Sequence, residues 1–538
     1  MTSRSRFDTH EVFNQSPPYD NVDLFTSDLP LQAAVSANGA AREANELADF
    51  GGQWGGAEMF AAAREANADT PALSSFDAKG FRRDTVEFHP AYHLFMARSI
   101  AAGLHASTWT AAGSRAAAPA EVARAARFYM AAQVETGHLC PLTMTRAAIA
   151  ALATAPALLA QLAPKIVTLS YDPRFRPWSE KTGMTLGMGM TEKQGGTDIR
   201  ANTTMATPAG EGYTLVGHKW FMSAPMSDAF LVLAQAPGGL TCFLMPRFRP
   251  DGSVNALRFQ RLKNKLGNRS NASSEVEFAD AFAWRVGDEG AGIRTILQMV
   301  QLTRLDCAIA SAGLMRMALA QAVHHCRHRA VFQKRLYDQP IMRAVLADLA
   351  LEVEGAVALV MRLSRALDRA ETDPGEAAYA RLMTPTAKYW ICKRAPAFVF
   401  EAMECLGGNG YVEDSILPRL YREAPVNAIW EGSGNVMCLD VMRAMRGEME
   451  GGLVATLAQR LDLEGDAFAA PQEADARLLV GKLAALATSG ALADSAPSAI
   501  AEAYRQTRLH RSHDALYGAE ALGDSTVATL LERALPDS

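Results

Sequence analysis

Apolar residues recur every three or four positions along most of this sequence, which is the spacing of helices that bury one face. This pattern covers residues 31–169, returns at residue 290 and continues to residue 445. Between residues 171 and 286 it gives way to short β-like runs, at 213–216, 230–234, 241–245 and 274–278. The pattern therefore predicts a small β domain between two helical domains, the second of which we expect to be a four-helix bundle.

Changes in composition divide the chain into five expected parts. The first 30 residues mix proline, aspartate, asparagine and serine with isolated aromatics, which is typical of an extended arm. After residue 446, glycines at 447, 451 and 452 and an acidic patch mark the start of a helical extension. The predicted fold class is α+β and mostly α, with an arm over residues 1–30, a helical domain over 31–177, a small β-barrel or sandwich over 178–286, a helical bundle over 287–446 and the extension over 447–538.

Composition and charge indicate which partners and which cellular compartment to expect for the protein. Of the 538 residues, 49% are hydrophobic and 21% charged, and the formal net charge of −5 gives no overall attraction to nucleic acid. The seven cysteines include no C-x-x-C pair, which argues against a disulfide framework or a zinc ribbon and favours a reducing, cytoplasmic setting. The polar start and the short apolar run at 147–163 predict no membrane segment. His324 with His328, and His89 with His93, lack an evident third ligand, so we expect no metal.

Residues 187–198 form a glycine-rich stretch with several hydroxyl side chains, and residues 219–223 follow it as a strand-like run. Small residues let the backbone approach a planar or phosphorylated ligand closely. The spacing lacks both the G-x-G-x-x-G of a dinucleotide-binding turn and the G-K-[ST] of a phosphate loop. The residues alone are compatible with a ligand-binding loop or with a set of tight turns.

A second candidate is Glu431, whose carboxylate lies between Trp430 and a Gly-Ser-Gly turn. Flexible backbone ahead of a helix suits anion binding. Neighbouring apolar side chains would desolvate the carboxylate and make it a stronger base. An ordinary solvated glutamate in a turn is the alternative interpretation.

The sequence M-T-E-x-x-x-G-T-D at 190–198, followed by G-H-K-W-F-M-S at 217–223, resembles the flavin-cradling strands of the acyl-CoA dehydrogenase family. Further segments resemble that family in the same order, at 287–293, 303–304, 328–333, 404–411 and 421–423. The variant T-E-K-Q-G-G, with residues 140–145 and 268–273, is similar to the AidB branch, which consists of bacterial proteins of the alkylation response. The resemblance spans residues 7–446 and implies the architecture of that family.

The resemblance implies FAD as the cofactor, an acyl-CoA-like thioester as the substrate, a homotetramer as the assembly and electron-transfer flavoprotein as a candidate acceptor. In the family, a glutamate at the position of Glu431 takes the α-proton as the catalytic base, and the flavin accepts hydride from the β-carbon. Arg304, Trp430 and Gly432 would lie near the substrate. The implied FAD-binding residues are Met190, Thr191, Gly196, Thr197, Phe221, Met222, Ser223, Arg329, Phe332, Gly407, Gly408, Ser433 and Asn435, with Arg329 and Phe332 reaching the cofactor of a neighbouring subunit.

Several positions depart from the family pattern. Gln333 replaces the usual glycine, while Glu404 and Asn435 each replace the usual glutamine. An acidic side chain at 404 would repel a diphosphate unless it were paired, so we expect altered cofactor contacts there. Lys193 and Gln194 replace the usual Pro-Gly and predict a reshaped entrance for acyl-CoA.

The extension raises the question of nucleic acid. The AidB branch has a C-terminal helical extension that binds duplex DNA through arginines, and here Arg505, Arg508 and Arg511 recur at three-residue spacing. On an α-helix they would share one arc and could contact successive phosphates. The extension as a whole is acidic, which opposes such binding at long range. The alternative to a dehydrogenase is therefore a largely non-enzymatic, DNA-associated flavoprotein that protects DNA from alkylating agents.

Overall fold

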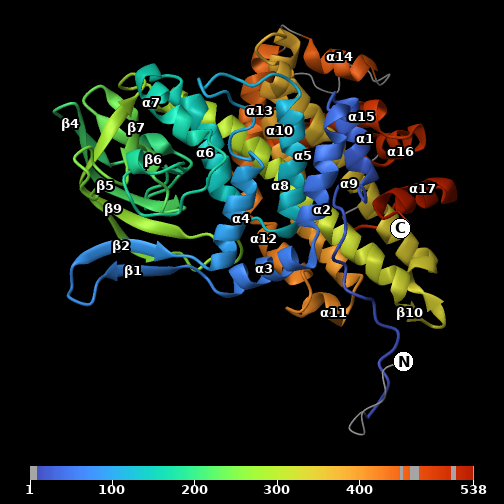
Figure 1. The fold of residues 1–538 in the computed structure, drawn as a ribbon. Helices are drawn as coiled ribbons and strands as arrows, with labels where there is room; N and C mark the ends of the chain where they lie inside the picture. Colours follow the sequence, from blue (N-terminus) through green and yellow to red (C-terminus); the bar gives the residue numbers. More distant parts are fainter. Residues whose placement is uncertain (1–8, 449–451, 461–471, 511–515, 537–538) are drawn as a thin grey trace.

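The computed structural model describes residues 9–448, 452–460, 472–510 and 516–536 (Figure 1). Residues 9–28 run along the molecule as an extended arm without a helix or strand. The arm ends at Asp28, whose carboxylate caps the first helix by accepting from the Leu31 amide (3.0 Å) and also pairs with Arg316 (2.8 Å). Both contacts anchor the arm to the helical core.

The N-terminal domain is helical, as its apolar periodicity predicts. Its helices are α1 (Leu29–Ala37), α2 (Ala44–Trp54), α3 (Ala57–Ala68), α4 (Pro90–Ala101), α5 (Ala120–Val134), α6 (Leu139–Leu152) and α7 (Pro156–Ile166). One part of the predicted helical region is instead a hairpin of β1 (Ala72–Phe76) and β2 (Arg82–Glu87), which projects below the β domain in Figure 1. The hairpin forms because it docks on strand β8 (Leu257–Leu262), where the Phe259 amide donates to the Asp84 carboxylate (3.0 Å).

The central domain is a small closed barrel. Its other strands are β3 (Leu186–Gly189), β4 (Met205–Ala209), β5 (Gly212–Ser223), β6 (Ala229–Ala236), β7 (Gly239–Pro246) and β9 (Ser273–Val286). The strands pair in the order β3-β6-β4-β5-β9-β7, β8 pairs with β9, and a β6–β7 pairing closes the ring. All four predicted strand runs lie within β5, β6, β7 and β9, and their inward residues, including Phe230, Val232 and Phe243, are buried.

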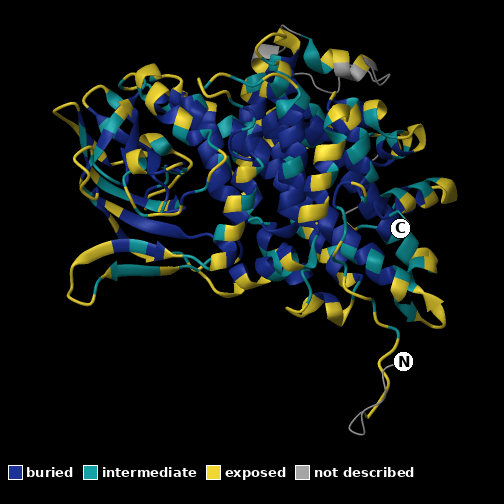
Figure 2. Cartoon of the chain, viewed as in Figure 1, coloured by how far each residue is buried: buried dark blue, intermediate teal, exposed yellow. Residues whose placement is uncertain are grey.

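The third domain is built on four long helices. These are α8 (Gly292–His328), α9 (Pro340–Arg369), α10 (Pro374–Glu404) and α13 (Gly434–Glu448). Shorter elements connect them: β10 (Ala330–Val331), β11 (Lys334–Arg335), α11 (Gly408–Tyr411) and α12 (Leu417–Glu423). Helix α8 lies at the centre and packs against α5, α6, α9 and α10, so the N-terminal domain and the bundle share one apolar core. Figure 2 shows this core as the most deeply buried part of the molecule.

The extension is helical where it is described, and it belongs to the same core. It contains α14 (Leu453–Arg460), α15 (Ala476–Ser495), α16 (Ser498–Tyr504), a π-helical turn at Arg505–Leu509 and α17 (Asp524–Ala534). Helix α15 packs against α9 and α10, and α17 packs against α9. The helical segment Glu473–Ser495 is long and apolar enough to cross a membrane, but 72% of its apolar window is buried inside the fold. Its hydrophobicity is explained by this packing.

Candidate active site

The loop that carries Glu431 links a short 3-10 turn at Val426–Ala428 to the start of α13. Glu431 has a φ of +59° and Gly432 a φ of +99°, so two consecutive residues adopt the left-handed region. Three successive carbonyls of this loop accept hydrogen bonds from buried cationic side chains. Arg304 Nε donates to the Glu431 carbonyl (3.0 Å), and Lys388 Nζ donates to the Trp430 carbonyl (2.6 Å) and to the Gly432 carbonyl. Helices α8 and α10 therefore fix the backbone of the loop.

The carboxylate of Glu431 has the environment of a base that is partly withdrawn from water. Burial raises its pKa, while a hydrogen bond from the Thr303 hydroxyl and the charges of Lys388 and Arg304 lower it, and the net shift is upward. Thr303 Oγ1 donates to Glu431 Oε2 at 2.7 Å. The side chain is thus more basic than an ordinary glutamate and is held in one orientation.

The other residues predicted near the substrate lie in this loop or contact it. Arg304 is buried and also pairs with Asp440 (2.6 Å), which in turn pairs with Arg381 (2.7 Å), so ion pairs hold the guanidinium that contacts the loop. Trp430 is half-buried, and its Nε1 donates to Asn427 Oδ1 (3.1 Å).

The glycine-rich loop after β3 is organised by Glu192, a residue that sequence reasoning did not single out. Its fully buried carboxylate accepts from Lys219 (2.7 Å), from the Thr203 amide (2.7 Å) and from the Thr204 hydroxyl (2.6 Å). Burial alone would raise the pKa of Glu192, but Lys219 and the hydroxyl and amide donors outweigh it and lower the pKa to about 2. The sequence signal that could have indicated this pair is the glutamate of T-E-K together with the lysine of H-K-W.

The predicted flavin residues of the barrel share one edge. The Trp220 amide donates to the Thr191 carbonyl (2.8 Å), which joins the loop to the end of β5. Phe221 is 48% exposed there, whereas Met222 is fully buried in the barrel core. A Cβ on Gly196 would lie 2.3 Å from Thr191 Oγ1, so only glycine fits beside that hydroxyl. Thr197 lies exposed in the same loop.

The barrel edge and the Glu431 loop face the same region of the molecule. The Ser223 hydroxyl and the charge of Glu431 both act on the thiol of Cys140, a residue of α6, whose pKa burial raises to about 12. Met190 and Trp430 pack against one common apolar cluster. The structure therefore brings together the predicted site residues of the barrel, α8 and the loop before α13, and Cys140 of α6 lies beside them.

A second group of predicted cofactor residues lies at the far end of the bundle. The 26 positions from 303 to 329 along α8 correspond to about 39 Å, which exceeds the length of a dinucleotide. Phe332 is 94% exposed just beyond this helix. Gly407 and Gly408 are exposed at the same end, where Cys326 Sγ lies 4.0 Å from the Cys405 carbonyl. One chain therefore presents two separate groups, not one continuous cofactor site.

The arm contacts this second group. Asn14 accepts from the Ala330 amide (2.7 Å) and donates to the Ala330 carbonyl (2.8 Å), and Arg329 donates to the Asn14 carbonyl (2.8 Å). Asn409 donates to Gln15 at 3.3 Å. The arm thus holds the segment that carries Arg329.

Ser433 and Asn435 lie exposed at the start of α13. Asn435 Oδ1 accepts from Arg477 Nε (2.9 Å), so the extension reaches a predicted cofactor position. Sequence reasoning missed Arg477 because nothing in the sequence places residue 477 beside residue 435.

The predicted DNA-contacting face is wrong at Arg508. Its side chain is fully buried, donates to Asp348 and lies 3.4 Å from Glu352. Arg505 is partly exposed and pairs with Glu502 (2.9 Å), and Arg511 lies outside the described residues. The spacing argument assumed an α-helix in solvent, whereas residues 505–509 form a π-helical turn that packs against α15 and directs Arg508 toward carboxylates of α9.

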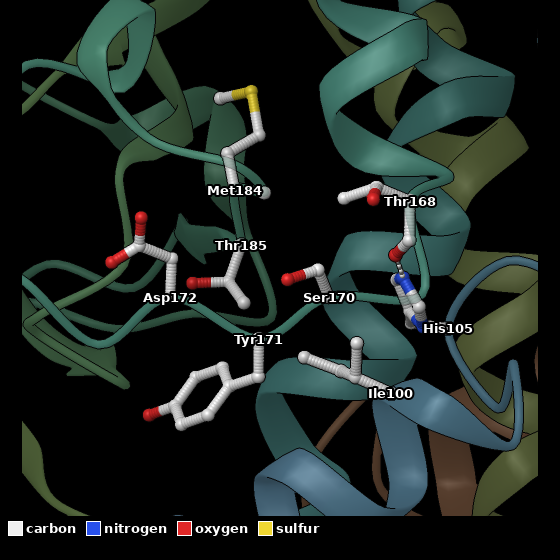
Figure 3. Close-up of a pocket in the computed structure, with 9 residues that line it drawn as sticks. Ile100, His105, Thr168, Ser170, Tyr171, Asp172, Met184 and Thr185 are labelled. Atoms are coloured by element: carbon white, nitrogen blue, oxygen red, sulfur yellow. Dashed lines mark hydrogen bonds between the residues drawn. The ribbon is translucent and has the colours of Figure 1, made fainter.

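A small cavity lies elsewhere, between α4 and the loop before β3 (Figure 3). It encloses about 10 Å³, is lined by residues such as Tyr171, Asp172 and Thr185, and includes His105, whose Nε2 lies 3.0 Å from the Thr168 carbonyl. This volume is about that of one water molecule. It shares no residue with the Glu431 loop. Within the described ranges, no group of three His, Cys, Asp or Glu side chains is placed to hold a metal.

Comparison with known proteins places this architecture in one family. Three family profiles match successive parts of the chain: the adaptive response protein AidB N-terminal domain at residues 14–173, the acyl-CoA dehydrogenase middle domain at 187–281 and the acyl-CoA dehydrogenase C-terminal domain at 290–446. The chain is 53% identical over 439 residues to AidB of Escherichia coli, covering 81% of this chain and 80% of that protein. It belongs to the acyl-CoA dehydrogenase family, whose members are FAD-dependent oxidoreductases. Within the family it is a member of the AidB branch.

Solved structures show the same fold. The apo-form of Bd2924 superposes with a TM-score of 0.80 at 27% identity, covering 89% of this chain and 99% of that one. Caenorhabditis elegans ACDH-11, solved in complex with C11-CoA, superposes with a TM-score of 0.78 at 24% identity, covering 100% and 95%. The predicted fold class, an acyl-CoA dehydrogenase architecture with a helical extension, is confirmed.

The residues at the barrel edge fit the family cofactor. Thr191 and Ser223 offer half-buried hydroxyls, Phe221 offers an aromatic edge, and Gly196 lets the backbone pack directly against the Thr191 side chain. These groups would hold the flavin ring end, with hydroxyl and backbone donors available to its polar atoms.

Proposed function

We propose that this protein catalyses the α,β-dehydrogenation of an acyl-CoA thioester, with Glu431 as the base that removes the α-proton. The observation that carries this proposal is the Glu431 carboxylate itself. It has a raised pKa, is oriented by Thr303 and acts on the Cys140 thiol together with Ser223 of the barrel edge. A base of this kind is what α-proton abstraction beside a thioester requires.

The roles of the side chains follow from their positions. Glu431 accepts the α-proton at its carboxylate, and Thr303 keeps one carboxylate oxygen hydrogen-bonded so that the other is directed at the substrate. Arg304 and Lys388 hold the loop backbone and bring positive charge near the proton acceptor. FAD, when bound, supplies the hydride acceptor that no amino-acid side chain can provide. The half-buried indole of Trp430 restricts water at the loop.

The substrate class is supported by relatives. Worm ACDH-11, which has the same fold, was solved in complex with C11-CoA. We extend that class to this chain because its base and barrel edge lie together as the chemistry needs. The two electrons must leave the flavin after each turnover, and we propose a protein of the electron-transfer flavoprotein class as acceptor in a cytoplasmic setting.

The direct test is anaerobic bleaching of the flavin absorbance by a panel of acyl-CoA thioesters, compared between wild type and Glu431→Gln. We expect bleaching by at least one thioester in wild type and none in the variant, with FAD bound equally by both. FAD that no thioester reduces would overturn the dehydrogenase proposal. Thr303→Val should bleach more slowly and need a higher pH, because Glu431 loses a hydrogen bond that lowers its pKa.

The two groups of predicted cofactor residues support a shared site in a homotetramer. A neighbouring copy would bring its Phe332 and Arg329 to the cofactor held at the barrel edge of the first chain. Phe332→Ser removes a side chain that is 94% exposed in one chain, so it should leave the fold stable. We expect this variant to lose FAD on dilution and to dissociate in sedimentation experiments. Unchanged FAD retention would contradict the shared site.

Binding of duplex DNA would need a different surface from the one that sequence spacing suggested. Arg508 is an internal ion-pair partner, so the face made by Arg505, Arg508 and Arg511 does not carry a DNA proposal. Gel-shift measurements with Arg505→Met, which changes a partly exposed arginine, test whether this residue contributes to DNA binding. Equal DNA retention in wild type and this variant would remove Arg505 from consideration.

A further inference from the structure

Lys388 is a buried lysine on α10 whose contacts lie on both sides of the proposed base. Its side chain is almost completely buried, and its ammonium donates to the carbonyls of Trp430 (2.6 Å) and Gly432. Among the described residues it forms no ion pair within 4 Å of a carboxylate, so carbonyl oxygens are its direct partners. No sequence feature pointed to this residue, because it lies 43 positions from Glu431.

The contact constrains the loop geometrically. In an extended chain, carbonyls two residues apart are separated by about 6.6 Å. An ammonium with hydrogen bonds of the observed length can bridge oxygens no more than about 5.2 Å apart, twice the distance to the Trp430 carbonyl. The residue between must therefore fold back, and Glu431 does so with a φ of +59°. A non-glycine residue in this region is strained and needs surrounding contacts to hold it there.

We propose that Lys388 is a positioning residue, which holds Glu431 in its left-handed conformation by binding the two carbonyls that flank it. This inference rests on the proposed function, because it assigns to Lys388 the placement of the base in that reaction. Arg304 contributes from α8 through the Glu431 carbonyl itself (3.0 Å). Lys388 is distinct because it spans the base and fixes both adjoining peptides.

The same ammonium acts on the carboxylate through its charge. The groups that face Glu431 are Thr303, Arg304 and Cys307 from α8, Lys388 from α10 and Cys140 from α6. Burial raises the pKa of Glu431, and Thr303, Lys388 and Arg304 oppose that rise. Both thiols have raised pKa values and are neutral near pH 7. Loss of Lys388 would therefore raise the pKa of Glu431 further, so proton abstraction would require a higher pH.

A purely structural lysine would behave differently. If Lys388 only filled space and satisfied carbonyls, its loss would lower stability and cofactor content but leave the pH at which Glu431 ionises unchanged. The pH dependence of proton abstraction is thus the measurement that separates the two roles. The matched control is Lys181→Met, which removes another buried ammonium, paired with Asp228 (2.6 Å) beside the barrel and outside the Glu431 loop.

The experiment follows exchange of the α-protons of 3,3-dimethylbutanoyl-CoA with solvent deuterium by mass spectrometry, using FAD-loaded protein. Its β-carbon carries no hydrogen, so exchange reports proton abstraction without hydride transfer. For Lys388→Met we expect the exchange rate at pH 7 to fall about tenfold or more. We also expect the acid limb of its pH–rate profile to move upward by about one pH unit or more. Lys388→Arg, which keeps the charge, should retain the wild-type limb with a smaller loss of rate. Lys181→Met should keep the wild-type limb.

A second readout makes the inference independent of turnover. Infrared spectra of protein labelled with ¹³C-glutamate, with Glu431→Gln subtracted, give the pH at which Glu431 itself ionises. An upward shift in Lys388→Met supports the action of Lys388 on Glu431 even if wild type exchanges no α-proton, a result that counts against the proposed function alone. The inference would be overturned if wild type exchanges α-protons but Lys388→Met has the same acid limb in its pH–rate profile and the same infrared titration as wild type. The proposed function would stand in that case.

Discussion

Replacing Arg508 by methionine tests whether the extension is part of the core. The guanidinium is fully buried, donates to Asp348 and lies near Glu352, both of which are carboxylates of α9. Methionine keeps much of the aliphatic volume but removes the cation between these two acids. Breaking a buried ion pair costs about 3–5 kcal/mol. Because Glu352 keeps its two-point contact with Arg394 (2.6 and 2.7 Å), we expect a loss near the lower limit, about 3 kcal/mol.

The assay is denaturant unfolding followed by circular dichroism, with DNA retention measured on the same preparations. Arg505→Met is the matched control, because Arg505 pairs with Glu502 near the surface, where an ion pair contributes at most about 1 kcal/mol. We expect a large fall in the unfolding midpoint for the first variant and little change for the second. Equal midpoints, combined with weaker DNA retention in Arg508→Met, would refute the internal placement of Arg508.

Three further substitutions, the last with a control, test other contacts. Asn14→Ala removes the paired hydrogen bonds to Ala330, so limited proteolysis should cut the arm faster than in wild type. Burial would raise the pKa of Glu135, but its hydrogen-bond donors lower it to about 2. Glu135→Gln should therefore lower the free energy of unfolding by about 3 kcal/mol at pH 7. In acid-unfolding curves, this difference from wild type should disappear as the pH falls from 4.5 to 2. Gly313→Ala would place a Cβ 2.5 Å from a backbone carbonyl of α5. Overpacking of about 1–3 kcal/mol should outweigh the gain of about 1 kcal/mol in helix propensity, whereas Gly52→Ala, which meets nothing within 4 Å, should raise the thermal midpoint.

The fold was predictable because it is built mainly from long helices whose apolar residues recur at regular spacing. Helices α8, α9 and α10 each bury most of their residues, and their apolar spacing is visible in the sequence. Strand β8 was missed although Leu257 and Phe259 alternate with exposed Arg258, which is the period of a strand. The hairpin β1–β2 has no such alternation: its strands form because they pair with each other and dock on β8, and tertiary contacts of that kind do not appear in a local window.

The site was predictable only where a motif carried it. Glu431 was singled out by its flanking aromatic residue and glycines, and its predicted role as the base came from the resemblance to the acyl-CoA dehydrogenase family. Lys388 could not be singled out in this way, because its partners are backbone carbonyls, which have no side-chain signature in the sequence. Glu192 was seen as part of a motif but not as the buried acceptor that shapes the loop, since its donors at 203, 204 and 219 become neighbours only when the barrel closes.

The ion pairs of the extension also decide how its role can be tested. Arg508 and Arg533 pair with carboxylates of α9, and Arg533 Nε lies 2.5 Å from Glu354. A count of charged residues in the sequence treats these arginines as surface charges, although they contribute little to the field outside the protein. Truncation after residue 446 would leave buried acids of α9 without these cations and would expose the apolar faces on which α15 and α17 pack. Loss of DNA retention in such a truncated chain would therefore report a damaged core as readily as a missing DNA site. Substitutions at exposed positions of the intact chain separate the two explanations, because they leave the α9 pairs in place.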